Sequence, residues 1–231
     1  IGSFRFVVVV LRYSWLLICN IMSRILCLLF IVFLPSVVSA QTLMRDVFAQ
    51  LPETILPLLT KNNRLDCIDF IENNMEARVK NKFDEQVILE ALTDDYLRIQ
   101  VSANLSVEMK LFGQMNDTLI CVNRVYKGPV EDSEVRVYSM QWSMLYKMQR
   151  PEVEQFLIKS DSAELNSDTM AIIREESEYL PLIKASLSPD TESITWTLQS
   201  GEFTKPIKKV AEKYLQPVVI GLTDSIPMPQ D

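Results

Sequence analysis

Residues 105–112, Leu-Ser-Val-Glu-Met-Lys-Leu-Phe, alternate apolar and polar side chains along a stretch of strand length. A period of two predicts a β-strand whose successive side chains point to opposite faces of a sheet. We therefore expect one face to carry Leu105, Val107, Met109 and Leu111, and the other Ser106, Glu108 and Lys110. This pattern is typical of an antiparallel sheet with one face toward water.

Four further strand-length runs flank this stretch, at residues 87–92, 96–101, 119–125 and 134–140. Turn-forming residues separate them, among them Asp94-Asp95 and Gly128-Pro129. Because the connections between consecutive runs are short, we expect a meander.

Helical patterns precede and follow these strands. Two are expected at residues 43–59 and 65–75, and three more from Pro151, Asp168 and Pro206; strands are expected at 180–187, 194–199 and 217–222. This order predicts an α+β fold: an N-terminal helix pair, an antiparallel meander sheet, then further helices and strands. A second interpretation divides the domain into two similar helix-plus-sheet halves.

The first forty residues differ in composition from the rest, with three arginines and no acidic residue. Residues 22–40 begin at the first methionine, continue through a ten-residue apolar segment and end in Val38-Ser39-Ala40, which predicts a signal peptide. We expect residues 1–21 to be an upstream extension that is not native; a membrane anchor formed by the joined apolar runs is the alternative. Residues 41–222 are expected to form a single α+β domain, with 41–150 and 151–222 as the candidate halves, and residues 223–231 a flexible tail.

Charge and composition exclude several classes of function. The chain has 23 Lys and Arg, 30 Asp and Glu, a net charge of −7 and no histidine. Removing residues 1–40 leaves 20 basic and 30 acidic residues, hence −10, which argues against a nucleic-acid partner. The missing imidazole excludes Ser-His-Asp and Cys-His nucleophiles and histidine-based metal sites. No glycine-rich phosphate loop and no Ser-x-x-Lys follow residue 40, and we expect no cofactor.

Two cysteines, Cys67 and Cys121, lie beyond the leader. In an oxidising compartment they can form a disulfide. Each lies in an apolar setting, so a pair of buried free thiols is an equal alternative.

The best candidate polar cluster is Arg64 with the carboxylates Asp66, Asp69, Asp94 and Asp95. Paired carboxylates can bind a divalent cation or act as acid and base, and Arg64 can hold an anion. The structural alternatives are helix capping and turn formation for the carboxylates, and an internal ion pair of Arg64 with Asp94 or Asp95. No residue is assigned as catalytic, cofactor-binding or metal-ligating.

Aromatic residues offer a second candidate surface, for a sugar or a protein. They are Tyr138, Trp142, Tyr146 and Trp196. Because they belong to strand patterns, core packing is the more frequent role.

Several segments carry a resemblance to a known family. They are the run 58–70, Leu-Leu-Thr-Lys-Asn-Asn-Arg-Leu-Asp-Cys-Ile-Asp-Phe, and residues 75–79, 92–97, 109–111, 120–121, 128–129, 132–133 and 138–142. Over nearly all of residues 43–222 the sequence resembles a domain-of-unknown-function family of secreted Bacteroidales proteins. The resemblance implies a Gram-negative envelope setting and carries over no reaction, cofactor or catalytic residue.

These observations together predict a secreted, non-enzymatic binding protein that is periplasmic or exposed at the cell surface. Its expected partner is an envelope protein or a glycan, and no stable membrane span is expected once the signal is cleaved. The alternative is a hydrolase of envelope polysaccharide that uses carboxylates alone.

Overall fold

The computed structural model describes residues 43–114, 117–157, 171–175, 182–201 and 205–224, all within one compact unit, Thr42–Asp231. The expected upstream extension (1–21) and signal peptide (22–40) lie outside the described residues. The expected tail, 223–231, is described only at its first two residues. Within the described part of the chain, no helix is both long and apolar enough to cross a membrane.

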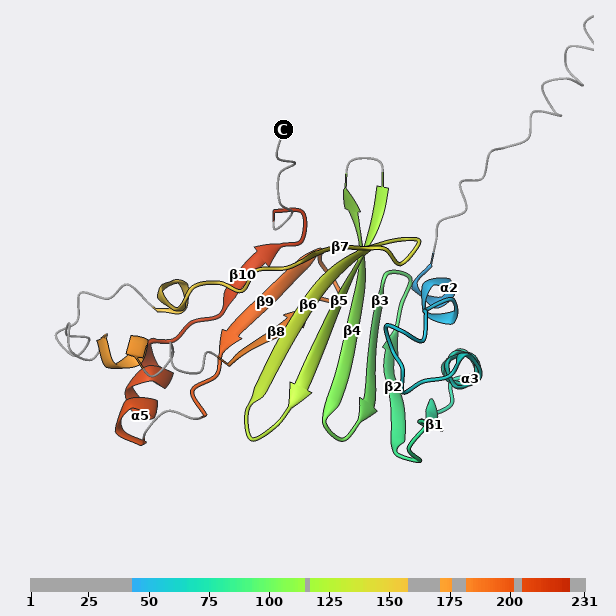
Figure 1. Cartoon of the computed structure of the whole chain (residues 1–231), viewed down its shortest axis with the longest axis horizontal. Helices are drawn as coiled ribbons and strands as arrows, with labels where there is room; N and C mark the ends of the chain where they lie inside the picture. Colours follow the sequence, from blue (N-terminus) through green and yellow to red (C-terminus); the bar gives the residue numbers. More distant parts are fainter. Residues whose placement is uncertain (1–42, 115–116, 158–170, 176–181, 202–204, 225–231) are drawn as a thin grey trace, which may run out of the picture. The chain divides into compact units, whose positions relative to one another are not determined.

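A seven-stranded antiparallel sheet forms most of the fold (Figure 1). The strands lie in chain order, so every neighbouring pair is a hairpin. They are β1 (Arg78–Lys80), β2 (Gln86–Leu92), β3 (Tyr96–Ser102), β4 (Leu105–Gln114), β5 (Asp117–Lys127), β6 (Glu131–Ser139) and β7 (Met144–Lys147).

Two short helices cover one face of this sheet at its β1–β2 end, α2 (Met44–Ala49) and α3 (Lys61–Glu72) (Figure 1). Thr60 caps α3: its Oγ1 accepts from the Asn63 N–H at 3.2 Å, and Asn63 Oδ1 accepts from the Thr60 N–H at 3.3 Å. This capping box satisfies amide groups that the first turn leaves unpaired. A first core fills the space between helices and sheet, with Phe48, Leu59, Ile68, Leu97, Ile99 and Met109 among its buried residues.

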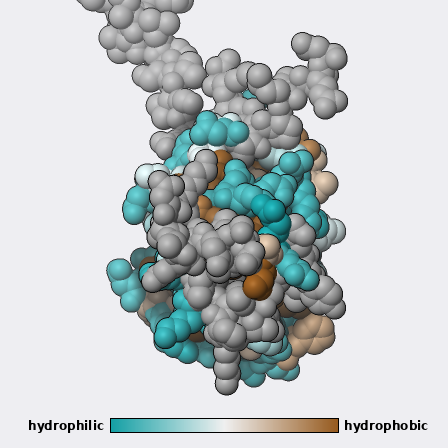
Figure 2. All heavy atoms as spheres, turned by 90° about the vertical axis from the view of Figure 1, so that its left-hand side faces the viewer, coloured by the Kyte–Doolittle hydropathy of each residue, from teal (hydrophilic) through white to brown (hydrophobic). Residues whose placement is uncertain are grey.

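A smaller antiparallel sheet packs against the opposite face, in the order β10-β9-β8. Its strands are β8 (Ile183–Leu187), β9 (Ser193–Leu198) and β10 (Val218–Gly221), and η1 (Val153–Phe156) and α5 (Lys205–Tyr214) accompany it. A second core lies here, with Phe112, Cys121, Val137, Phe156, Ile194 and Trp196 among its buried residues. Figure 2 views the molecule from the side of α5 and β10 and shows hydrophilic residues mixed with separate hydrophobic ones.

The expected α+β class is wrong, because the protein is mostly β. The helix expected from Pro151 is a four-residue 3-10 helix, and the described helices are short. The candidate halves are also not similar, since one contains the seven-stranded sheet and the other a three-stranded sheet. Helical periodicity in short apolar segments does not show what fraction of a chain is helical. Here most of the regular secondary structure is β-strand.

The expected water-facing side of residues 105–112 is also wrong. Ser106, Glu108 and Lys110 are buried, because the second sheet packs over the face that they occupy. Alternation predicts which residues share a face, but it does not say what covers that face.

Candidate functional site

The structure separates the polar cluster expected from the sequence. Arg64 is buried, and its guanidinium donates from Nε to the Phe48 carbonyl at 3.1 Å and from Nη1 to the Leu59 carbonyl at 3.0 Å. Burial lowers the pKa of Arg64, and the charge of Glu53 opposes this effect. Among the described contacts Arg64 has no ion pair with Asp94 or Asp95. Its two hydrogen bonds instead join the end of α2 to the loop that follows it.

The four carboxylates of that cluster have different surroundings. Asp66 and Asp69 are exposed on α3, Asp94 is exposed in the β2–β3 turn, and Asp95 forms an ion pair with Lys110. Within the described residues, no group of three or more acidic or cysteine side chains is placed to hold a metal ion.

A pocket of about 240 Å³ lies between the start of α2, the end of α3 and the β2–β3 turn. Three apolar and four polar residues line it: Leu43, Ile71 and Leu92, and Arg45, Glu72, Thr93 and Asp94. Arg45 and Glu72 are joined by an ion pair at 2.6 Å. Only one of the expected carboxylates, Asp94, reaches this pocket, so it does not bring an acid and a base from that cluster together.

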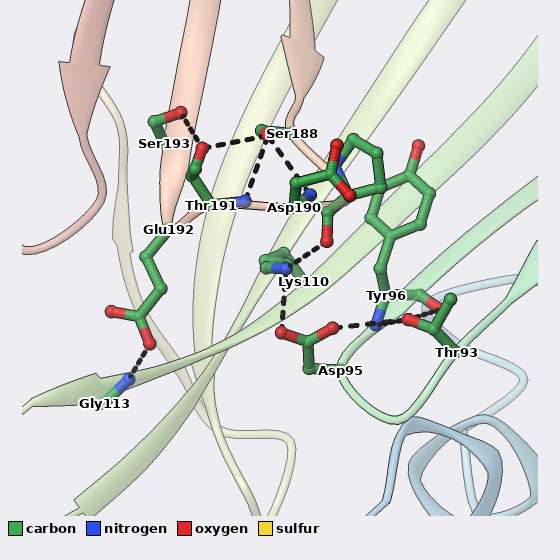
Figure 3. Close-up of polar contacts among 11 residues, drawn as sticks. Thr93, Asp95, Tyr96, Lys110, Gly113, Ser188, Asp190, Thr191, Glu192 and Ser193 are labelled. Carbon is green, nitrogen blue, oxygen red and sulfur yellow. Dashed lines mark hydrogen bonds and ion pairs between the residues drawn. The ribbon is translucent and has the colours of Figure 1, made fainter.

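On the other side of the β2–β3 turn, Lys110 connects the two sheets (Figure 3). Its buried ammonium donates to the Pro189 carbonyl at 2.7 Å and forms an ion pair with Asp95 at 2.8 Å. The Asp95 carboxylate also accepts from Thr93 Oγ1 at 3.2 Å. Lys110 therefore fixes the β8–β9 turn to the β2–β3 turn.

Ser188 organises the β8–β9 turn (Figure 3). Its Oγ accepts from the Asp190 N–H at 3.3 Å, the Thr191 N–H at 3.1 Å and Thr191 Oγ1 at 2.9 Å. Serine in such a position stabilises a turn through its own backbone neighbours. Lys110 is engaged by the Pro189 carbonyl and the Asp95 carboxylate instead of by Ser188.

The outer edge of β8 is satisfied by side chains of the first sheet instead of by another strand. The N–H groups of Ile183, Ala185 and Leu187 donate to Asp132 Oδ1 at 3.1 Å, Ser133 Oγ at 2.8 Å and Glu108 Oε2 at 2.9 Å, respectively. Asn123 Nδ2 donates to the Ala185 carbonyl at 2.8 Å and to Glu108 Oε2 at 2.9 Å. Buried amide groups need such partners, so these four side chains attach the second sheet.

Sequence reasoning missed this attachment. Asn123 inside an otherwise apolar run was the available signal, because a buried strand does not carry an amide side chain without a partner. Burial of Tyr96 raises the pKa of its hydroxyl, and the charge of the nearby Glu108 raises it further.

A basic cluster lies on the face of the first sheet that the helices partly cover, at the β5–β7 end. Arg124, Arg136 and Lys147 surround Glu134, with nitrogen–oxygen distances of 3.7, 2.9 and 3.1 Å. The register explains this, since Arg124 pairs with Glu134 and Arg136 with Lys147 across the strands. Burial raises the pKa of Glu134, but hydrogen bonds from Arg136 and Lys147 outweigh it, and the pKa is lowered overall.

Aromatic and apolar side chains continue this surface. The rings of Tyr138 and Trp142 lie 6.0 Å apart, and Met144 and Leu145 are 55% and 48% exposed. Trp142 is half-buried and adopts a positive φ of 63°. Tyr138 itself is buried in the first core, so its ring supports Trp142 from below. We call the basic cluster together with Trp142, Met144 and Leu145 the open face. Of the expected aromatic set, two are core residues: Tyr138 is buried in the first core and Trp196 in the second.

Both cysteines are free, buried thiols, and they belong to different cores. Burial, and secondly the charge of Asp66, raises the pKa of Cys67 to about 12. Burial, and secondly Glu108, raises the pKa of Cys121 as well.

Comparison with known proteins gives a family and a fold. The family described as "Protein of unknown function (DUF3256)" matches residues 36–221. A solved domain of an uncharacterized protein from Porphyromonas gingivalis W83 is similar at a TM-score of 0.64 and 21% identity, covering 79% of this chain and 94% of that one. Among curated proteins none matches. The expected membership in a family of unknown function is thus confirmed, whereas its expected secretion stays a prediction.

Proposed function

Because this chain belongs to the DUF3256 family of proteins of unknown function, its role must be inferred from its own residues, and we propose that it is a non-enzymatic binding protein of the Gram-negative cell envelope. The leader pattern at residues 22–40 supports export to the periplasm or the cell surface. The open face is the proposed binding surface.

The exposure of apolar side chains beside cations on the open face carries this proposal. Met144 and Leu145 lie about half exposed on an end strand of the sheet, next to Arg136 and Lys147. Protein interfaces are enriched in aromatic residues, methionine and arginine. This combination is therefore better suited to a partner surface than to bulk water.

The backbone of Trp142 adds support. A positive φ costs a bulky residue roughly 1–2 kcal/mol, and the residue in this turn is tryptophan instead of glycine or asparagine. Strained residues concentrate at functional sites, and here the strain places an aromatic ring at the edge of the open face.

The surroundings of the expected carboxylates do not support the alternative hydrolase, because only Asp94 of the four lines the described pocket. A glycosidase needs two carboxyl groups roughly 5–9.5 Å apart across one cleft. Asp66 and Asp69 lie exposed on α3, and Asp95 is occupied by Lys110. No observation favours the hydrolase specifically, so we advance the binding function alone.

A capture experiment with matched variants tests the proposal. The full chain is immobilised and exposed to a Bacteroidales envelope extract, and bound proteins are quantified by mass spectrometry against increasing free chain as competitor. We expect saturable capture of a defined protein that Met144→Asp with Leu145→Asp abolishes. The control Val219→Asp, at a 63% exposed apolar position on β10, should leave capture unchanged.

Two outcomes would refute the binding function at this face. One is equal capture by the wild type, the double variant and the control. The other is hydrolysis of envelope polysaccharide by the purified chain, measured as release of reducing ends.

A further inference from the structure

We propose that the open face binds an acidic, extended segment of a partner protein, in which a carboxylate residue and an apolar residue are two positions apart. This inference rests on the proposed function and specifies the chemistry of the partner.

The first step is the charge balance of the basic cluster. Arg124, Arg136 and Lys147 share one carboxylate, Glu134, so the cluster has two positive charges in excess. The chain as a whole carries −7. A cationic surface attracts acidic partners, whereas the net negative charge of the chain as a whole repels further copies of it.

The second step is which of the cations a partner can reach. Arg124 is largely buried, and its Nη2 donates to the Ile55 carbonyl at 2.7 Å. Lys147 is 58% exposed, and Arg136 is about one-third exposed. Arg136 and Lys147 face the same side because they are cross-strand partners, so they form the accessible pair.

The third step is the distance from this pair to the apolar residues. Tyr138 pairs with Met144, and Tyr138 lies two residues beyond Arg136 on β6. Residues two apart on a strand share a face and are separated by roughly 7 Å. An extended partner chain has the same spacing, so an acidic residue at the cation pair places the second residue after it at Met144.

The fourth step separates a protein from other anionic partners. Anionic lipid headgroups also suit cations beside apolar residues, but the net charge of −7 repels a whole anionic membrane surface while allowing a local segment to dock. A glycan supplies few apolar groups to cover Met144 and Leu145. The combination of charge and apolar exposure therefore favours a peptide segment.

A direct binding measurement tests this partner chemistry. The probe is a rhodamine-labelled peptide that contains two Glu-Ser-Leu repeats, and its binding to the full chain is followed by fluorescence anisotropy. We expect Lys147→Glu to weaken binding at least tenfold. Lys80→Glu, at a 73% exposed lysine on β1 at the other end of the sheet, should change it less than twofold. Raising the salt from 50 to 500 mM should also weaken binding.

Further probes make each outcome decisive. A peptide with lysine in place of glutamate should bind at least tenfold more weakly. If Lys147→Glu fails to fold, Lys147→Gln repeats the test, because glutamine removes the positive charge without placing a second carboxylate beside Glu134. Equal binding of both peptides, equal effects of Lys147→Glu and Lys80→Glu, or preferential binding to phosphatidylglycerol vesicles would overturn the inference. If envelope capture still depends on Met144 and Leu145 in that case, the proposed function stands and only the acidic partner is refuted.

Discussion

Replacing Glu108 by alanine should weaken the attachment of the second sheet more than replacing any exposed acidic residue by alanine would. Glu108 is buried at the interface between the sheets, where its Oε2 accepts from the Leu187 N–H and from Asn123 Nδ2, both at 2.9 Å. Alanine removes the carboxylate and leaves these donors facing a space with no acceptor of the protein.

The size of the effect follows from these contacts. A hydrogen bond to a charged group contributes about 1.5–3 kcal/mol, and a donor left unsatisfied in the interior costs a similar amount. Leu187 loses its acceptor, whereas Asn123 keeps a second bond to a backbone carbonyl at 2.8 Å. The hydroxyls of Tyr96 and Ser186 are 3.4 Å from Oε1 and contribute little. We therefore expect a loss of about 2–4 kcal/mol in the free energy of unfolding.

Urea denaturation followed by far-UV circular dichroism measures this loss. With a slope of about 2 kcal/mol per molar urea, the midpoint should fall by roughly 1–2 M. The matched control is Glu90→Ala, which removes a partly exposed carboxylate on β2 that pairs with Arg98 at 2.8 Å. An exposed pair of this kind contributes at most about 1 kcal/mol.

A midpoint for Glu108→Ala equal to that of Glu90→Ala would refute the reasoning, because it would mean that the buried carboxylate does not hold β8. Glu108→Gln refines the test. Its amide oxygen can still accept from the Leu187 N–H, so its cost should be smaller than that of alanine.

Three further predictions concern Arg64, Cys67 and Glu134. Arg64→Met leaves two backbone carbonyls without their donors and should cost about 2–4 kcal/mol in urea unfolding; a loss no larger than that of the exposed Arg45→Met would contradict this role. Because the pKa of Cys67 is about 12, iodoacetamide at pH 8 should label it only after unfolding, as peptide mass spectrometry can show; labelling of the native chain would contradict its burial. The pKa of Glu134 is lowered from its ordinary value near 4.5, so the stability it provides is present above that value and lost as the pH falls through its folded pKa. Glu134→Gln should make the melting temperature less dependent on pH below about 5, and an unchanged dependence would be inconsistent with the ion pairs.

The strands of the first sheet could be predicted because their pattern is local. The runs expected between residues 87 and 140 correspond to β2 to β6, within a few residues at each end. Each is bounded by turn residues, and adjacent strands pair through short connections, so neither position nor order required distant information.

The candidate site could not be predicted in the same way. In the sequence, Arg64, Asp94 and Asp95 look like a functional cluster of one cation and two carboxylates. In the structure Arg64 binds backbone carbonyls and Asp95 binds Lys110. The basic cluster depends on the registers of β5, β6 and β7, and a shift of one residue would send its side chains to the other face.

The sequence by itself determined the meander of β2 to β6, and it indicated the family of unknown function to which the chain belongs. Only the tertiary structure decided that the polar face of β4 is buried and that the fold is mostly β. The physical reason is the distance along the chain: Ser133 and Ala185 are 52 residues apart, and Glu108 and Leu187 are 79 apart. The pattern within a strand records which side chains share a face, and the partner that satisfies their polar groups is chosen by packing far away in sequence.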